Sequence, residues 1–331
     1  MTYHIYGIGA ALVDTEIDVT DHDLAQLGID KGLMTLVDAE RQQALVDYLS
    51  THMTHSKRAS GGSAANSIIA ASYFGAKTFY SCKVGPDQNG EFYLGDMQAA
   101  GVACNKNDHG DEDVTGKCLV LVTPDAERTM LTHLGISATL CRKMLDHDAI
   151  ARSQYAYIEG YLVTSDTGRA AAIELRETAE KHGVKTALSL SDPGMVEFFG
   201  DGLREMLGNG VDLLFCNEHE AQGFTSTDNT QAAAEKLKHY AKTFAITCGP
   251  RGALVFDGSE LHIIEPHAVK AVDTNGAGDM FAGAFLYAIT HGYSYRDAGR
   301  LASRASAEVV KNYGPRLPAE KHAAIHKEVF G

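Results

Sequence analysis

The sequence predicts an α/β fold built on a mostly parallel β-sheet, with a smaller second sheet beside it. From about residue 150 onward, apolar strand-like runs alternate with segments of helical periodicity, which is typical of right-handed βαβ units. Two strand-like runs, 116–122 and 128–134, interrupt the otherwise α/β pattern of the chain as a hairpin joined by the residues TPDAE. The chain has 331 residues, of which 44% are hydrophobic, so it can bury a large core.

The elements of the first half follow from local signals. Residues 4–13 (HIYGIGAALV) are expected to form a buried strand that runs into a tight turn. Helical spacing and acidic first residues predict helices at 21–29 and 38–50. The stretch 61–75 predicts a glycine turn followed by a helix that ends at Gly75, and 77–85 predicts a strand.

The second half supplies most of the parallel sheet. Four apolar runs predict strands, and the segments 167–183 and 231–242 have helical spacing; the runs are AYIEGYLV, KTALSLSDP, VDLLFCNEHEA and TFAITCGPRGALVF. No repeat, low-complexity segment or linker divides the chain. The hairpin therefore is expected to belong to a small separate sheet, which the segment 14–37 joins.

Charge and composition exclude several classes of function. The formal net charge is −14, which argues against a nucleic-acid scaffold or a binder of anionic membranes. The six cysteines include no CxxC pair and no zinc-finger spacing, so they are expected to be free thiols in a reducing compartment. The first residues lack a basic n-region, and no apolar run approaches the roughly 18 residues that span a bilayer. We therefore expect a cytoplasmic protein.

The stretch DTNGAGDMFAGAFL (273–286) is the strongest candidate for chemistry. Gly276, Ala277 and Gly278 allow a tight turn into an apolar helix, whose first N–H groups suit an anion such as a transferring phosphoryl group. Asp279 lies within one turn of that anion and could accept a proton from an attacking hydroxyl. From these residues alone, Asp279 could equally be a residue that stabilises the helix N-terminus.

Other phosphate and nucleotide motifs fail. GDEDVTGKC (110–118) has five residues between its glycines and a cysteine after the lysine, so it is not a P-loop. No HRD or DFG triplet of a protein kinase is present. GIGAAL (7–12) begins like a dinucleotide fingerprint but has Leu12 where the third glycine or alanine belongs, so a dehydrogenase is only a distant alternative.

Four motifs in order resemble the ribokinase-like, or PfkB-type, family of carbohydrate and nucleoside kinases. They are GGSAANSIIAASYFGAKTFYSCKVGPDQNGE (61–91), NEHEA (217–221), TCGPRGALVF (247–256) and DTNGAGDMFAGAFL (273–286). The resemblance covers nearly the whole chain, and GGSxxN and DTNGAGD are closer to adenosine kinases than to ribokinases. It implies a three-layer sandwich around a mostly parallel sheet, with a small β-sheet lid. The large domain would comprise 1–13, 38–113 and 138–331, and the lid would comprise 14–37 and 114–137.

The resemblance assigns catalytic roles to two places. Asp279 matches the family's base, and Gly276, Ala277 and Gly278 match its anion hole. Arg128 matches a lid arginine that balances phosphate charge during transfer, although a solvated hairpin arginine is an open alternative.

The resemblance also implies ATP and Mg²⁺ as cofactors and leaves a monovalent cation open. Asn217 and Glu220 match the family's NxxE motif, through which Mg²⁺ and phosphates are organised, with Glu220 acting on the ion through water. Thr247, Gly249 and Gly252 match its nucleotide loop. Read without the family, the first pair would be helix-capping residues and the second set a hairpin turn.

The acceptor is expected to be a small molecule that carries a ribose. Asp14 matches the carboxylate that binds sugar hydroxyls, Gly61, Gly62 and Asn66 match the second sugar-binding element, and Ser63 is expected nearby. Without the family, Asp14 would be a solvated strand-end acid and Asn66 a polar residue on an exposed helix face.

One departure concerns the acceptor. Adenosine kinases usually carry an asparagine directly after GxG, where this chain has Ala10. The motifs still lead us to expect phosphorylation of the primary hydroxyl of adenosine or a related nucleoside, and Ala10 keeps a kinase of ribose or a ketohexose as the nearer alternative. An inactive nucleoside-binding sensor is the alternative from another class. The chain would act as a monomer or as a homodimer paired through the lid.

Overall fold

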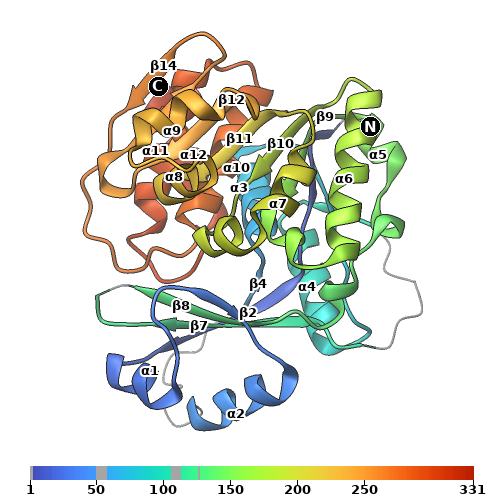
Figure 1. Cartoon of the computed structure of the whole chain (residues 1–331), viewed down its shortest axis with the longest axis vertical. Coiled ribbons are helices and arrows are strands. Elements are labelled where there is room, and N and C mark those ends of the chain that lie inside the picture. Colours follow the sequence, from blue (N-terminus) through green and yellow to red (C-terminus); the bar gives the residue numbers. More distant parts are fainter. Residues whose placement is uncertain (1–2, 50–57, 106–112, 126) are drawn as a thin grey trace.

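The computed structural model describes residues 3–49, 58–105, 113–125 and 127–331. In these residues the chain forms two sheets, a large one with helices on both faces and a small one that lies across one edge of it (Figure 1). The prediction of an α/β fold with a second, smaller sheet is thereby confirmed.

The large sheet has nine strands in the described residues, in the order β14-β13-β12-β11-β10-β9-β1-β5-β6. All neighbours pair in parallel except β12 with β13 and β13 with β14. Its strands are β1 (Tyr3–Ile8), β5 (Thr78–Ser81), β6 (Ala103–Cys104), β9 (Ser153–Glu159), β10 (Lys185–Ser189), β11 (Val211–Asn217), β12 (Ala241–Thr247), β13 (Ala253–Phe256) and β14 (Leu261–Ile264).

Helices cover both faces of this sheet, because alternate strand residues point to opposite sides. Ile5 packs into one core and Tyr6 into the other. The first core contains α3 (Ser63–Phe74), α4 (Gln88–Ala99), α10 (Ala277–Thr290), α11 (Tyr295–Val309) and α12 (Ala319–Phe330). The second contains α5 (His147–Ala151), α6 (Asp166–Lys181), α7 (Pro193–Leu207), α8 (Glu218–Thr225) and α9 (Thr230–Leu237).

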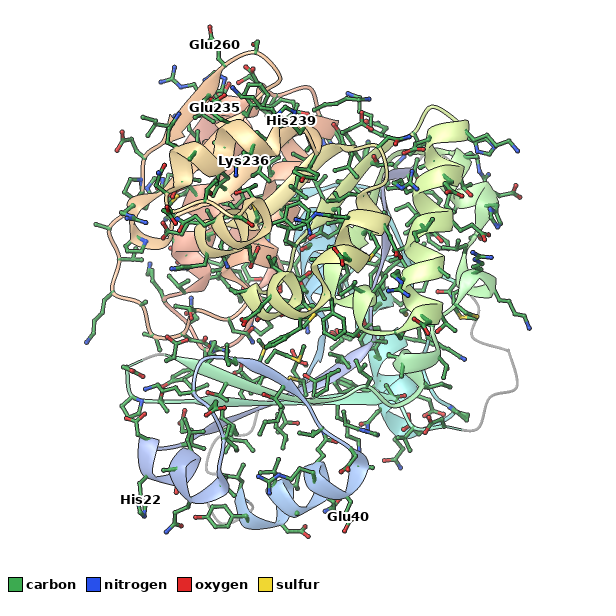
Figure 2. The ribbon with its side chains drawn as sticks, in the orientation of Figure 1. His22, Glu40, Glu235, Lys236, His239 and Glu260 are labelled. Carbon is green, nitrogen blue, oxygen red and sulfur yellow. The ribbon has the colours of Figure 1, made fainter. Side chains whose placement is uncertain are left out.

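The small sheet runs in the order β3-β8-β7-β2-β4, with strands β2 (Leu12–Asp18), β3 (Met34–Leu36), β4 (Arg58–Gly61), β7 (Gly116–Val122) and β8 (Arg128–His133). Along β7, Leu119 and Leu121 point away from the large sheet and pack with Leu24 of α1 (Asp21–Leu27) and Leu45 of α2 (Ala39–Leu49). The outer face of this sheet is therefore covered by two helices, whose own outer surface carries polar side chains such as His22 and Glu40 (Figure 2).

Two expected segments differ from the structure. The strand and tight turn predicted at 4–13 are present as β1 and residues 9–11, but the range also includes the start of β2, which leaves the large sheet for the small one. The strand predicted at 77–85 pairs only over Thr78–Ser81. In addition, α2 and β4 pack with the small sheet, so we propose that the large domain resumes after residue 61 and not at residue 38.

The six cysteines all lie in the described part of the chain and are free. Among the described residues, no helix has both the length and the apolar character needed to cross a membrane.

Candidate active site

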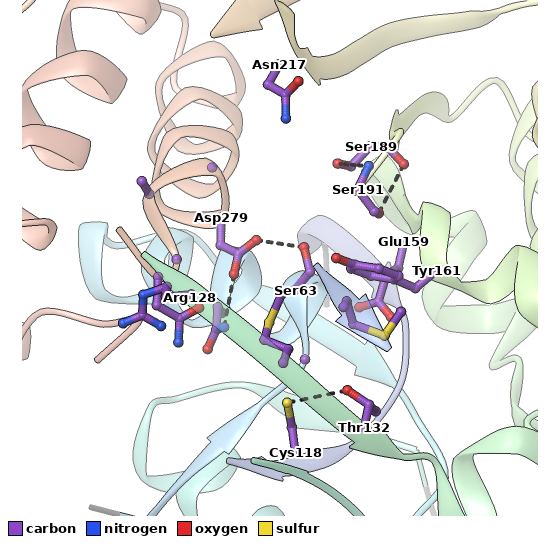
Figure 3. Close-up of a pocket in the computed structure, with 18 of the residues that line it drawn as sticks. Ser63, Cys118, Arg128, Thr132, Glu159, Tyr161, Ser189, Ser191, Asn217 and Asp279 are labelled. Carbon is purple, nitrogen blue, oxygen red and sulfur yellow. Dashed lines mark hydrogen bonds between the residues drawn. The ribbon is translucent and has the colours of Figure 1, made fainter. Parts of the chain in front are cut away.

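A cavity of about 360 Å³ lies between the small sheet and the carboxyl edge of the large one (Figure 3). Ligands of open α/β sheets bind outside the carboxyl ends of the parallel strands. Five neighbouring strands each contribute a lining residue at or just after that end: Ala10, Glu159, Ser189, Asn217 and Thr247. The small sheet contributes mainly apolar lining from the opposite side.

The N-terminus of α10 opens onto this cavity. Gly276 has φ 70°, and a Cβ there would lie 2.5 Å from Cα of Pro315, so only glycine fits. A Cβ on Gly278 would instead meet no atom within 4 Å, which shows that this turn faces open space. Gly276, Ala277 and Gly278 all line the cavity, where the helix start offers N–H donors and a partial positive charge.

Asp279 is held at the cavity wall by two residues of α3. The Ser63 hydroxyl donates to Oδ1 over 2.6 Å, and Nδ2 of Asn66 donates to Oδ2 over 3.0 Å (Figure 3). Burial raises the pKa of Asp279 from its usual 3.8 to about 6, although both donors act in the opposite direction. A carboxyl group of this pKa is ionised near neutral pH and remains basic enough to accept a proton from a hydroxyl.

Ser63 and Asn66 therefore contact the candidate base directly. The sequence also predicts that both residues bind the acceptor, and their contact with the acceptor stays a prediction. Oδ1 of Asn66 is buried and has no hydrogen-bond partner in the described residues, which leaves it available to a hydroxyl donor.

Replacing Ser63 by Ala should move the acidic limb of the rate profile to higher pH. A base must be deprotonated, so kcat/KM should fall as pH drops below about 6. The Ser63 hydroxyl stabilises the ionised form, so its loss raises the pKa of Asp279 and shifts that limb upward. The measurement is kcat/KM from pH 5 to 9. Ser67→Ala is the control, because Ser67 lies one turn along α3 and donates to the Ser63 carbonyl without touching Asp279. If the acidic limbs of the Ser63→Ala, Ser67→Ala and parent profiles coincide, Ser63 does not stabilise the ionised form of Asp279.

Asp14 lies on β2, where only 6% of the residue is exposed, and it lines the cavity. Burial raises its pKa to about 7, against the opposing effect of Arg316. A Cβ on Gly61 would lie 2.1 Å from this carboxylate, and one on Gly62 (φ 98°) would lie 2.4 Å from the Ala10 carbonyl oxygen. The two glycines of the GGS motif thus make room for Asp14 and for the turn after β1.

Asn217 and Glu220 form a reciprocal cap at the start of α8. The Glu220 N–H donates to Oδ1 of Asn217 over 2.9 Å, and the Asn217 N–H donates back to Glu220 over 2.9 Å. Both residues nevertheless line the cavity, and burial raises the pKa of Glu220 to about 8. One carboxylate beside an amide fits Mg²⁺, which keeps waters and phosphate oxygens as its other ligands, and a cation there would favour the ionised carboxylate.

The predicted nucleotide loop follows β12. Thr247 lines the cavity. Gly249 has φ 54° and open space around its Cβ position, so another molecule can approach the backbone there. Gly252 instead allows close packing within the protein, because a Cβ there would lie 2.1 Å from the Ile264 carbonyl oxygen at the end of β14.

Arg128 joins the small sheet to the segment that precedes α10. Its guanidinium is ion-paired with Asp273, the first residue of the DTNGAGD motif, and both side chains are buried. Asp273 also accepts N–H bonds of 2.8 Å from Asn275 and from Gly314. The other guanidinium nitrogens of Arg128 have no acceptor within the described residues, and Arg128 lines the cavity. This arrangement excludes the solvated hairpin arginine.

Several lining residues escaped the sequence analysis, among them Glu159, Tyr161, Ser189, Ser191 and Asn275. Ser191 has φ 73°, and its hydroxyl accepts from the Gly160 N–H. Glu159 and Ser189 are the last residues of apolar strands, so the rule that sites form at carboxyl strand ends could have found them.

The sequence model of the pfkB family of carbohydrate kinases matches residues 29–322, so the chain belongs to this family. It is 30% identical over 344 residues to the adenosine kinase of Saccharomyces cerevisiae, with 97% of this chain and 98% of that protein covered. The crystal structure of adenosine kinase from Sinorhizobium meliloti matches with a TM-score of 0.93 and 32% identity over 99% of this chain and 100% of that one. A probable sugar kinase from Rhizobium etli CFN 42 matches with a TM-score of 0.92 and 31% identity over 100% of both chains.

These matches confirm the ribokinase-like fold and the PfkB-type assignment made from the motifs. The protein is an ATP-dependent kinase that acts on a nucleoside or a sugar.

Proposed function

We propose that this kinase transfers a phosphoryl group from ATP to the primary hydroxyl of adenosine or a related nucleoside and so produces the 5′-monophosphate. The observation that carries the proposal is the position of Asp279 beside the open N-terminus of α10. Its carboxylate and the cavity-lining residues 276–278 belong to one turn, so a single hydroxyl can meet both a base and an anion site.

In the proposed reaction, Asp279 accepts the proton of the attacking hydroxyl. The first N–H groups of α10 stabilise the charge of the transferring group, and Arg128 supplies positive charge from the small sheet. ATP would lie toward Thr247 and Gly249. Mg²⁺, which would be held near Asn217 and Glu220, neutralises phosphate charge when bound. Most of the rate enhancement would come from alignment and fixed electrostatics.

Apolar lining favours a nucleoside over a free sugar. The cavity is lined by five apolar side chains of the small sheet and its connections: Leu12, Met34, Leu36, Met130 and Leu134. A free sugar presents hydroxyls to such a surface, whereas a purine base would bury it. Burial of roughly 100 Å² of apolar surface is worth about 2.5 kcal/mol. The naming of the yeast and Sinorhizobium relatives as adenosine kinases agrees with this choice.

A sugar kinase is the second candidate, and Ala10 favours it. The position that carries an asparagine in adenosine kinases offers only a methyl group and backbone atoms here. The Rhizobium relative, described as a probable sugar kinase, is as similar as the Sinorhizobium adenosine kinase.

A screen of ADP release separates the two candidates. Initial rates with ATP and Mg²⁺ would be compared for adenosine, inosine, cytidine, ribose and fructose, with an acceptor-free reaction as the blank. We expect kcat/KM for adenosine to exceed that for ribose by roughly 70-fold, the equivalent of about 2.5 kcal/mol. Equal or greater efficiency with ribose or fructose would overturn the nucleoside assignment. Omission of Mg²⁺ should abolish the rate.

A further inference from the structure

Glu159 joins two backbone segments of the active site and has no role in the chemistry described above. It is the last residue of β9 and is 2% exposed. Its Oε1 accepts the N–H of Ala10 over 3.1 Å, and its Oε2 accepts the N–H of Ala64 over 2.8 Å. Ala10 belongs to the turn between β1 and β2, and Ala64 is the second residue of α3.

The space around this carboxylate is closely filled. A Cβ on Gly9 would lie 2.5 Å from Oε2 of Glu159 and 2.6 Å from the Tyr80 hydroxyl oxygen. The Tyr80 hydroxyl donates to the Ala10 carbonyl over 3.2 Å. The turn after β1 is thus held against the start of α3, and each Glu159 oxygen accepts one of the two amides.

The amide of Ala64 leads directly to the candidate base. Ser63 precedes it and Asn66 follows two residues later, and these two side chains donate to the Asp279 carboxylate. α3 and α10 are far apart in sequence, so local structure does not align them. Burial raises the pKa of Glu159 to about 7, against the opposing effect of the Ala64 and Ala10 N–H donors, so the carboxylate is ionised above that pH. In that form its bonds to backbone N–H groups are among the stronger hydrogen bonds in proteins.

We propose that Glu159 is a positioning residue, which holds the N-terminus of α3 in place and thereby sets Ser63 and Asn66 against Asp279. The inference rests on the proposed role of Asp279 as the base. Glu159 itself acts through these residues and makes no contact with the reacting atoms.

The test is a double-mutant cycle between Glu159→Gln and Asp279→Asn. Glutamine has the same shape but presents one N–H₂ group to a backbone donor, so only one of the two amides keeps its acceptor. We expect Glu159→Gln to lower kcat by about 10- to 100-fold in the parent enzyme, the effect of a small misplacement. In the Asp279→Asn enzyme the same change should lower kcat by less than about 3-fold, because the base that Ser63 and Asn66 hold is already lost. KM for ATP should stay within about 3-fold throughout.

A general loss of structure would give a different pattern. Equal losses of kcat in both backgrounds would overturn the proposal, and so would a raised acceptor KM with unchanged kcat, which would make Glu159 a substrate ligand. Asp212→Asn is the matched control. Asp212 accepts the Thr186 N–H over 2.8 Å near the opposite end of the strands, so it should change thermal stability without changing kcat. If the glutamine variant does not fold, Glu159→Asp takes its place. Aspartate retains the charge but is too short to reach both amides, so kcat should again fall in the parent enzyme and change little in the Asp279→Asn enzyme.

The cycle also separates the two claims. If Asp279→Asn alone leaves kcat unchanged, the assignment of the base fails. If Asp279→Asn lowers kcat but Glu159→Gln does not, only the positioning role fails.

Discussion

Replacing Asp279 by Asn should lower kcat by roughly 10²–10⁴-fold and leave the affinity for nucleoside largely intact. Asparagine fills the same space and can still accept the bond from Ser63, but it cannot take up the proton of the attacking hydroxyl. The measurement combines a coupled ADP assay for kcat with calorimetric titration of adenosine into each enzyme.

The alternative, that Asp279 only stabilises the start of α10, predicts a different result. An acid in the first turn of a helix contributes about 0.3–1 kcal/mol to stability and nothing to turnover. Asp297 is the corresponding acid in the first turn of α11, where it accepts from Ser294. Asp297→Asn should therefore change stability slightly and leave kcat unchanged. If Asp279→Asn lost nucleoside binding without losing turnover, the assignment of Asp279 as the base would be contradicted.

Replacing Asp14 by Ala should raise the KM for the acceptor by roughly 10- to 100-fold and leave the KM for ATP unchanged. A carboxylate that accepts a hydroxyl hydrogen bond typically contributes about 1.5–3 kcal/mol, which corresponds to this range. Asp14 lines the cavity close to Gly61, on the side of the cavity formed by the small sheet. Initial rates over a matrix of adenosine and ATP concentrations separate the two KM values.

Asp18 provides the control for this experiment. It lies on the same strand and the same face as Asp14, but at the exposed end of β2. Asp18→Ala should leave both KM values near those of the parent. If Asp14→Ala changed only the KM for ATP, the acceptor would have to be placed elsewhere in the cavity.

Local signals in the sequence were sufficient for much of the fold. Gly62 and Gly75 bound α3 because both adopt positive φ, which stops a helix at either end. The alternation of apolar strands and helices predicted the parallel sheet, and the hairpin at 116–134 is β7 paired with β8. The motifs placed Asp279, Asn217 and Thr247 at element ends that do line one cavity.

Long-range contacts were beyond such signals. Nothing local indicates that β2 pairs in parallel with β7, about a hundred residues away, or that α2 packs under the small sheet. The pattern at 4–13 predicted a strand and a turn, but it did not show that the chain changes sheets at residues 9–11. A periodic pattern reports which face is buried, but it does not name the partner.

The same distinction applies to the active site. By itself the sequence determined the turns, the caps and the motif residues, because these depend on residues within a few positions of one another. The class of enzyme followed from the resemblance of four motifs, taken in order, to a known family. Only the tertiary structure decided that Ser63 and Asn66 hold Asp279, more than 200 residues away, that Arg128 pairs with Asp273, and that Glu159 joins two segments. These contacts depend on how helices and strands pack across the sheet, and a linear pattern does not encode that packing in any local form.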